Sequence, residues 1–509
     1  MGERVHKSLL NAEVNVIFYF LSLFLAFFSR KIFLDCLGDE FIGLTGTLNN
    51  ILGYLNLAEL GIGSCISFFL YKPLQSNNKQ EIQELLSVFG YLYRIIGLII
   101  LAAGFLTSTF FPLIFSKSDL GLSIIYFSFY SFLGSSLISY FINYRQILLS
   151  ADQKNYLVAI YFQSASIVRT ALQIFLALTY KNLYLWVAIE FLFGIISCII
   201  LNWKINKEYP WLKTDKSQGK VLLGKYPGII KNTKQIFIHQ IKDFILGKSD
   251  ELFVFIFVSL KMVAYYGNYT MIITKITFLF RSALDGVNAG IGNLVAEGNK
   301  RHMLAVFWEL MTIRHFIAGI LCFSIYCFIE PFICLWLGSE YIMDHWILVL
   351  LTIYTYIYTS RGVVDAFNHA HGLYGDVWSA WLELFLNVSI TIVAGIKYGI
   401  IGILLGKLVS AGLIVVLWKP YYLFSSGFKF AVSVYWNGAI RYYLIFCISF
   451  ILAYYISHTI PINPYHNFYS WILYCGISIL AYLCINIVLL LCFAKGAISS
   501  IKRLKIWKK

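Results

Sequence analysis

The chain has 509 residues, of which 59% are hydrophobic and only 13% are charged. Soluble domains average roughly 45–50% apolar and about 25% charged residues, so this composition excludes an ordinary soluble protein. Forty lysines and arginines against 25 acidic residues give a net charge of +15, which in a soluble chain would indicate a nucleic-acid partner. In a membrane protein, basic residues also determine the orientation of the spans, so their distribution along the chain is considered first.

Apolar runs of about 20 residues or more predict an all-α polytopic membrane protein. The longest polar stretch, 204–235, is expected to be a loop rather than a soluble domain. Very short connections after the seventh and eleventh spans predict helical hairpins there. The first run continues into Phe27-Phe28 without a small-residue cleavage site, so it is expected to stay as a span. In chain order, about 14 transmembrane helices are predicted at 11–34, 43–71, 86–115, 120–147, 155–179, 183–203, 236–260, 263–295, 302–330, 345–370, 374–396, 399–421, 438–458 and 469–494.

The distribution of lysine and arginine predicts the orientation of these spans. With the N-terminus placed inside, 26 basic residues fall in inside segments and only 4 in outside segments. Cytoplasmic loops carry the excess of basic residues, so both termini are expected in the cytoplasm. The basic tail from Ser500 to Lys509 is expected to lie on the anionic inner leaflet, together with part of 204–235.

Charged residues also occur inside the predicted spans. A charge at the bilayer centre costs at least roughly 2.5–3.5 kcal/mol on insertion scales, so these side chains are expected to line a cavity, pair with each other or snorkel from helix ends. This indicates a transport pathway rather than a membrane anchor. The basic ones are Arg30, Lys31, Arg169, Lys242, Lys248, Lys275, Arg281, Arg314, Arg361 and Lys407, and the acidic ones are Glu59, Glu190, Asp250, Glu251, Asp285, Glu309, Asp365 and Glu383.

A short internal similarity predicts two parallel lobes of six helices. Gly43 and Gly267 follow the first spans of the two halves, and each is followed about twenty residues later by Gly-Ile-Gly or Gly-Ile-Gly-Asn, ending at Gly63 and Asn293. An even number of spans per half makes the repeats parallel, with the substrate site expected between them. The predicted organisation is residues 1–203 as the first lobe, 204–235 as a basic cytoplasmic linker, 236–421 as the second lobe, and 422–509 as two additional helices and a basic tail.

The same region resembles a known family. The run R-K-x-F-L-D-C-L-G-D-E-F-I-G-L starts at Arg30 and leads to A-E-L-G-I-G, which ends at Gly63. Further matches are S-D-E-L from Ser249, A-Y-Y-G-N-Y up to Tyr269, and P-F-I-x-L-W-L-G-x-E-Y from Pro331 to Tyr341. Together they resemble the polysaccharide-exporter family, the lipid-linked oligosaccharide flippases of the multidrug/oligosaccharidyl-lipid/polysaccharide exporter superfamily.

The resemblance implies two six-helix lobes around a V-shaped central cavity, alternating access, and an undecaprenyl-diphosphate-linked oligosaccharide as cargo in the bacterial inner (plasma) membrane. The related lipid II flippases use cationic residues of spans one, two and eight. Arg30 or Lys31 and Arg281 correspond to two of these, but span two has no Arg or Lys before Lys72. This departure favours a capsule, O-antigen or exopolysaccharide unit over the peptidoglycan precursor.

A diphosphate needs cations, and Arg281 is the first candidate for holding it. Asp285 lies four residues later on the same helix face, so a structural Arg–Asp pair is the alternative. Arg30 and Lys31 point about 100° apart, so one is expected to face the cavity while the other snorkels. Lys275 is a weaker candidate because it does not share the face of Arg281.

Further site candidates are acidic or lie near the inner half of the membrane. Lys248 and Asp250 are expected either to line the cavity or to form a cluster at a helix start. Glu59 is expected to titrate or to pair with a lysine. Arg169 and Arg361 are single mid-span charges, for which structural pairing is favoured over binding.

Three functions compete at this stage: a flippase for a lipid-linked glycan, a drug or cation antiporter of the same fold, and a polysaccharide polymerase or ligase. Short outside loops disfavour the enzyme, and the basic excess disfavours the antiporter. No G-x-x-x-x-G-K-[ST] motif is present, so coupling to Na+, H+ or the membrane potential is expected instead of ATP. Ten cysteines without C-x-x-C spacing predict no metal site or cofactor. Expected partners are the glycan lipid, membrane lipids, and a polymerase and chain-length machinery, but no nucleic acid.

Overall fold

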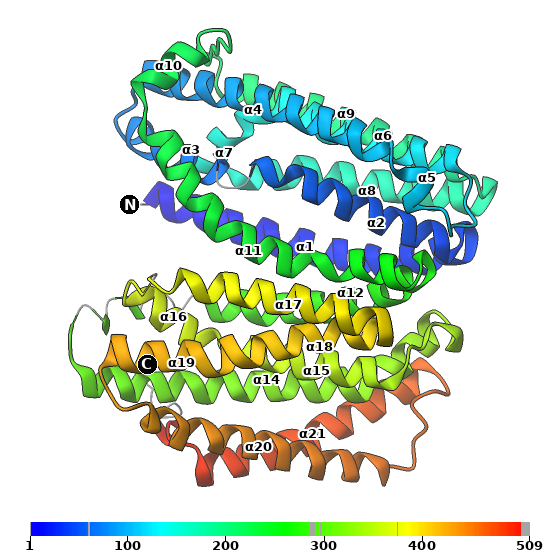
Figure 1. Ribbon diagram of the computed structural model, residues 1–509, viewed down its shortest axis with the longest axis vertical. Helices are drawn as coiled ribbons and strands as arrows, with labels where there is room; N and C mark the ends of the chain where they lie inside the picture. The colour runs from blue at the N-terminus through cyan, green and yellow to red at the C-terminus, as the bar shows by residue number, and fades with distance from the viewer. Residues whose placement is uncertain are drawn as a thin grey trace. The chain divides into compact units, whose positions relative to one another are not determined.

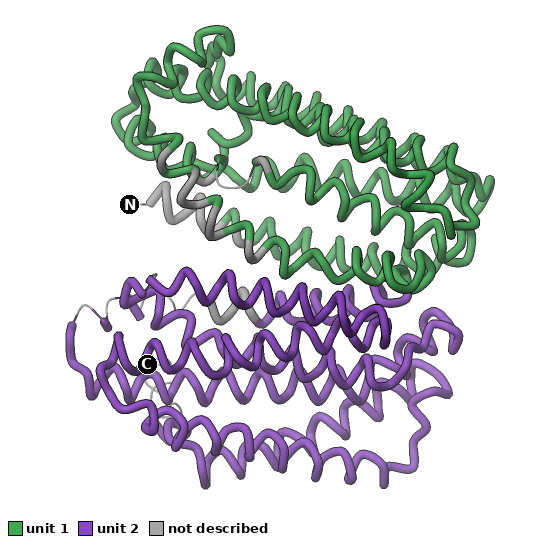
Figure 2. Tube along the Cα trace, in the orientation of Figure 1, with its two compact units in different colours: residues 1–264 green, residues 265–509 purple. Residues whose placement is uncertain are grey.

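A computed structural model describes residues 2–59, 62–285, 291–292, 294–295, 297–373 and 375–499, and these are helical or in short connections. The chain forms two compact units, residues 1–264 and 265–509 (Figure 2). The predicted all-α membrane fold is confirmed. Eleven helices of the described chain are long and apolar enough to cross a membrane, and each of the fourteen predicted spans overlaps at least one helix of the described chain.

The first unit is built from long helices linked by short turns, as Figure 1 shows. Contacts join α1 to α8, α4 to α6, α6 to α9, and α11 to both α2 and α3. The elements are α1 (Gly2–Leu37), α2 (Asp39–Leu55), η1 (Asn56–Glu59), α3 (Ile62–Gln75), α4 (Lys79–Ser108), α5 (Phe111–Ile114), α6 (Leu122–Ile142), η2 (Asn143–Arg145), α7 (Gln146–Ala151), α8 (Asn155–Tyr180), α9 (Leu183–Glu208), α10 (Gly219–Lys225) and α11 (Gly228–Phe257).

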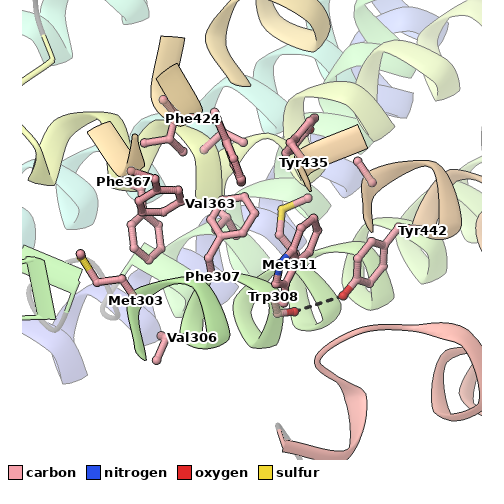
Figure 3. Close-up of a cluster of buried hydrophobic side chains, with 14 of the residues drawn as sticks. Met303, Val306, Phe307, Trp308, Met311, Val363, Phe367, Phe424, Tyr435 and Tyr442 are labelled. Atoms are coloured by element: carbon pink, nitrogen blue, oxygen red, sulfur yellow. Dashed lines mark hydrogen bonds between the residues drawn. The ribbon is translucent and has the colours of Figure 1, made fainter. Parts of the chain in front are cut away.

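The second unit contains the remaining helices, and α12 crosses its boundary. Its hydrophobic core gathers rings around Phe307, whose centroid lies 5.5 Å from those of Phe367 and Phe424 (Figure 3). The elements are α12 (Leu260–Asp285), α14 (Lys300–Trp336), η3 (Ser339–Tyr341), α15 (His345–Ser360), α16 (Gly362–Ala370), α17 (Val377–Tyr398), α18 (Ile400–Ala411), η4 (Gly412–Trp418), α19 (Lys419–Tyr422), η5 (Leu423–Phe428), α20 (Val432–His458) and α21 (Phe468–Phe493).

Local sequence signals explain several helix boundaries. An asparagine side chain accepts the free backbone N–H groups at the start of α4, α9, α14 and α21, as expected for this residue at an N-cap. Between α17 and α18 the chain turns on Gly399 alone, with φ of +56°. This position favours glycine, and the predicted hairpin of spans eleven and twelve is confirmed there.

The second predicted span is not one helix. It consists of α2 and α3, separated by the 3₁₀ turn η1 and residues 60–61, which lie outside the described chain. The last span of the second lobe also departs from a regular α-helix, because η4 and η5 are π-helical and enclose the single α-turn α19. The hydropathy pattern alone does not distinguish a continuous α-helix from a broken or π-helical one, because a break or an extra residue per turn leaves the amino-acid sequence equally apolar.

The boundary between the units differs from the predicted one. The sequence places it in the basic segment 204–235, whereas the compact units divide after Ala264. The physical reason is that α11 packs on α2 and α3, so it belongs with the first unit. Within 204–235 the chain is also partly helical, in α10 and the start of α11. The predicted six-span internal repeat remains a prediction.

Candidate functional site

Glu59 lies at the break of the second predicted span and is held by two tyrosines. The hydroxyl of Tyr93 on α4 donates to one carboxylate oxygen, and Tyr140 on α6 donates to the other at 2.5 Å. Both tyrosines are buried. The predicted pairing of Glu59 with a lysine is not what the described contacts show, because two neutral hydroxyls hold the carboxylate instead. This arrangement joins three elements at one polar point inside the unit.

The contact between α2 and α11 contains a second polar bond. Asn50 Nδ2 donates to Glu251 Oε2 at 2.6 Å. A close approach of the chain segments accompanies it, since a Cβ on Gly43 would lie 1.9 Å from the carbonyl oxygen of Leu260. Glycine is therefore required at position 43. From the sequence, Glu251 was recognised only as one of the charges inside the predicted spans. Its hydrogen bond with Asn50 depends on how α2 packs on α11, which no local sequence pattern predicts.

Lys248 and Asp250 do not share one environment. Lys248 is exposed, whereas Asp250 is only 8% exposed. Side chains two residues apart on a helix point to different faces, so the different environments of Lys248 and Asp250 follow from helix geometry. The structure does not bring the two together as one cluster, and a role for either in binding stays a prediction.

Arg30 and Lys31 also differ in their surroundings. Arg30 is half-buried, and its Nη2 donates to the carbonyl oxygen of Ala264 at 3.0 Å. Lys31 is exposed. The two neighbours thus point in different directions, as their spacing requires.

The remaining cationic candidates lie on α12. Lys275 is half-buried on this helix. The side chains of Arg281 and Asp285 lie outside the described residues, so neither the predicted pair nor the predicted diphosphate contact is tested. Their roles stay predictions.

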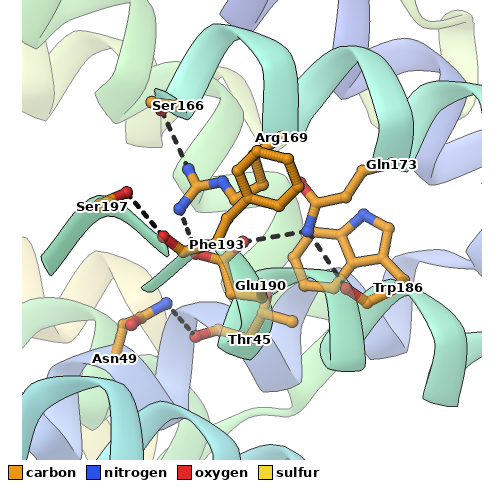
Figure 4. Close-up of polar contacts among 9 residues, drawn as sticks. All are labelled: Thr45, Asn49, Ser166, Arg169, Gln173, Trp186, Glu190, Phe193 and Ser197. Atoms are coloured by element: carbon orange, nitrogen blue, oxygen red, sulfur yellow. Dashed lines mark hydrogen bonds and ion pairs between the residues drawn. The ribbon is translucent and has the colours of Figure 1, made fainter. Parts of the chain in front are cut away.

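Arg169 and Glu190 form an ion pair between α8 and α9, with Nη1 and Oε1 2.5 Å apart (Figure 4). Gln173 Nε2 donates to the other carboxylate oxygen of Glu190 at 3.0 Å and to the carbonyl of Trp186 at 3.2 Å. Arg169 also donates to Ser166 Oγ at 3.1 Å. The predicted structural pairing of Arg169 is confirmed. The network lies within the α8–α9 hairpin and stabilises its register.

Arg361 is paired structurally as well. Its Nε lies 3.0 Å from Asp365 Oδ2, and its guanidinium lies over the ring of Tyr358 at 4.0 Å from the centroid. Tyr358 in turn donates to Glu383 Oε1 at 3.0 Å, and Glu383 is only 2% exposed. The prediction for Arg361 is confirmed, and Glu383 is drawn into a network that sequence reasoning did not assemble.

A third network ties the loop before α17 to α19. Asp376 Oδ2 accepts hydrogen bonds from Lys419 Nζ at 2.7 Å, Trp418 Nε1 at 3.0 Å and Ser379 Oγ at 2.9 Å. Burial alone would raise the pKa of Asp376. The hydrogen bond and charge of Lys419, with the bonds from Ser379 and Trp418, outweigh burial and lower that pKa below its ordinary value.

Within the described residues, no group of three or more His, Cys, Asp or Glu side chains is arranged to hold a metal ion. The polar groups found instead are carboxylates paired with arginine, lysine, asparagine or tyrosine. Such groups can bind or relay charge, and they stabilise helix contacts in a membrane, where an unpaired charge is costly.

Comparison with known proteins identifies solved structures that have a similar fold. No family model matches the chain, and no curated protein matches it. The structure is similar to a lipid II flippase MurJ in an inward closed conformation, with a TM-score of 0.64, 19% identity, and coverage of 93% of this chain and 98% of that one.

The structure is also similar to an inward-facing multidrug resistance transporter of the MATE family, with a TM-score of 0.62 and 14% identity. That match covers 83% of this chain and 99% of the transporter. Identities this low establish the fold and not the substrate. The chain therefore shares the polytopic helical fold of this flippase and this transporter.

Proposed function

We propose that this protein is a flippase that moves an undecaprenyl-diphosphate-linked oligosaccharide repeat unit across the bacterial inner membrane by alternating access. The observation that carries the proposal is the extent of the structural match. The lipid II flippase aligns with 93% of this chain and the multidrug transporter with 83%. The alignment with the lipid II flippase thus includes more of this chain than the alignment with the multidrug transporter does, which supports a lipid-linked glycan as cargo.

The charge inside the membrane supports a diphosphate cargo. Arg30 and Lys275 lie in helices of the two units, and the sequence adds Arg281. Arginine binds a diphosphate bidentately and lysine as a point charge, whereas a site for cationic drugs would be dominated by acids. The undecaprenyl tail can stay in the lipid while the charged head crosses.

Arg30 lies on an apolar membrane-spanning candidate, α1, whereas Lys275 lies on a more polar helix, α12. α11 and α12 are long enough to cross a membrane but are less apolar than the eleven membrane-spanning candidates, whereas α2 and α3 are shorter helices of 17 and 14 residues. A helix that is polar on one face is suited to line a pathway instead of facing lipid on every side. Lys248 and Asp250 belong to α11 and Lys275 to α12.

Two alternatives follow from specific observations. A multidrug or cation antiporter is favoured by the TM-score of 0.62 to the MATE transporter, which is close to that of the flippase. A lipid II flippase is favoured by the similarity to MurJ, but span two has no Arg or Lys before Lys72. We therefore propose a capsule, O-antigen or exopolysaccharide unit as cargo, with cytoplasmic termini and coupling to H+, Na+ or the membrane potential.

Deletion of the gene in the native host tests the proposal. Extracted lipids are analysed by mass spectrometry, and leaflet position is tested by adding a glycan-cleaving reagent outside spheroplasts. Protected lipid-diphosphate-linked repeat units are expected to accumulate on the cytoplasmic leaflet. Accumulation of the peptidoglycan precursor would indicate the lipid II alternative, and a lost efflux of cationic dyes with normal surface glycan would indicate the antiporter.

Complementation of the deletion then tests the site. Arg281→Ala is expected to abolish export at an unchanged protein level, and Arg281→Lys, which keeps the charge, is expected to retain part of it. Full export by Arg281→Ala would remove this residue from the site. A lost protein level would make its role structural.

A further inference from the structure

The second unit contains a pocket of about 320 Å³ at one end of its helix bundle. Its walls come from the second half of α14, the start of α15, the end of α20, the α20–α21 loop and α21. In Figure 1 the α20–α21 loop, drawn in orange to red, and the turn from α14 to α15 lie at the same end of this unit. Ligand pockets span about 300–1,000 Å³, so this one suits a single small unit rather than a chain.

A chain of hydrogen bonds crosses the pocket wall. Glu330 Oε1 lies 3.1 Å from His345 Nδ1, and His345 Nε2 lies 3.1 Å from the hydroxyl of Tyr326. In the neutral tautomer with its proton on Nδ1, the His345 ring donates to Glu330 and accepts at Nε2 from the hydroxyl of Tyr326. The second carboxylate oxygen of Glu330 then remains as an acceptor for the hydroxyl groups of a ligand.

Aromatic rings form the other side of the pocket. Tyr454 packs on His458 with centroids 4.2 Å apart and lies 5.7 Å from Tyr326. His458 Nδ1 bonds the carbonyl of Tyr454 at 3.0 Å, which leaves its Nε2 as an acceptor. Tyr465, 44% exposed, lines the pocket from the loop. Rings with polar tips offer an apolar face and hydrogen-bonding groups side by side.

The charge of the pocket selects the ligand chemistry. Among its described lining residues there is no lysine or arginine, and Glu330 is the only carboxylate. A phosphate or diphosphate would lack a cation there and would meet a negative charge. A neutral, polyhydroxylated ligand fits instead, because its C–H faces pack on aromatic rings and its hydroxyls donate to the carboxylate.

We propose that this pocket binds one sugar residue of the transported glycan, separately from the lipid diphosphate. The proposal rests on the proposed function for the identity of the glycan. In the predicted orientation α14 begins inside at Lys300 and Arg301, so its other end and the pocket face the outside. The pocket thus receives the sugar after the head group has crossed.

The test uses the full-length protein in nanodiscs and the free glycan released by mild acid from the host's lipid intermediates, labelled at its reducing end. This probe carries neither diphosphate nor lipid. Equilibrium dialysis measures its binding to the wild type and to Glu330→Gln, Tyr465→Ala and Tyr469→Ala. Tyr469 is the matched control, because it is a 72% exposed tyrosine outside the pocket lining. Thermal melting shows that each variant is folded.

The wild type and Tyr469→Ala are expected to bind alike, whereas Glu330→Gln and Tyr465→Ala bind at least about tenfold more weakly, because each loses a bond to a charged group or a packing face. Equal binding by all four proteins, or no binding by the wild type at millimolar glycan, would overturn the pocket proposal. If the deletion strain flips its glycan lipid normally while this binding pattern holds, the proposed function fails and the sugar site stands. If the strain accumulates the lipid but binding is unaffected, only the sugar site fails.

Discussion

Removal of Arg169 is predicted to destabilise the first unit through the carboxylate that it leaves behind. In Arg169→Met the side chain keeps an unbranched apolar stem and loses the guanidinium with its charge. Of its contacts with described residues, Glu190 then keeps the hydrogen bond from Gln173 at 3.0 Å and loses the ion pair with Arg169 at 2.5 Å. Because α8 and α9 are both candidate membrane spans, the remaining charge has little access to water.

The size of the effect follows from the burial of the pair. The side chains of Arg169 and Glu190 are 28% and 24% exposed, so both are mostly removed from solvent. Loss of one partner of such a pair costs about 3–5 kcal/mol, and we expect the lower end here. Glu190→Gln, which leaves Arg169 without its acceptor, is expected to cost a similar amount. In the double variant neither charge is left unpaired. Its loss of unfolding free energy should therefore be about 2 kcal/mol smaller than the sum of the two single losses.

The assay is unfolding of the purified protein in mixed micelles with increasing dodecyl sulfate, followed by tryptophan fluorescence. Lys397→Met is the matched control, because this exposed ammonium lies over the ring of Tyr398 at the end of α17. Complementation is measured in parallel, and the double variant should restore transport because the pair is structural. Losses below about 1 kcal/mol in the single variants, or strictly additive losses, would refute the reasoning.

Two further predictions concern single carboxylates. Tyr93→Phe and Tyr140→Phe should each cost about 1.5–3 kcal/mol in the same unfolding assay, and the double variant more than their sum, because Glu59 then keeps no described donor. An unchanged double variant would mean that the carboxylate finds other donors. The pKa of Asp376 is lowered by Lys419 against the opposing effect of burial, so the stabilisation is present above its unfolded pKa and is lost as pH falls through the lower folded value. Asp376→Asn should therefore melt earlier than the wild type at pH 7, and the difference should shrink as pH falls below the unfolded pKa of about 3.9. A difference that does not shrink on acidification would contradict this assignment.

Hydrophobic patterning predicted most of the helices closely. The span predicted at 155–179 is α8, Asn155–Tyr180, because it is long, apolar and bounded by polar residues at both ends. The break after α2 was not predictable from the pattern. Glu59 leaves the helix where hydroxyls from α4 and α6 reach it, and these lie 34 and 81 residues away in the chain.

For the candidate site, the sequence predicted which charged residues must be paired but not which partners they have. A mid-span arginine has to be paired, so the structural role of Arg169 followed from energetics alone. Its partner did not, since Glu190 becomes its neighbour only through the register of the α8–α9 hairpin. The pocket around Glu330 and His345 was not anticipated. These residues are 15 apart and come together with the α20–α21 loop only after folding.

The π-helical stretch before α19 makes the network of Asp376 depend on the residue count in η4. Each residue of a helix rotates the following side chains by a fixed angle about the axis, so an insertion or deletion in Gly412–Trp418 would keep the segment helical but change its phase. Trp418 and Lys419 would then turn away from Asp376 while Lys407, which precedes the change, kept its place over Tyr354. Single-residue length variants of this helix should therefore insert into the membrane and still lose the bonds that hold the α16–α17 loop.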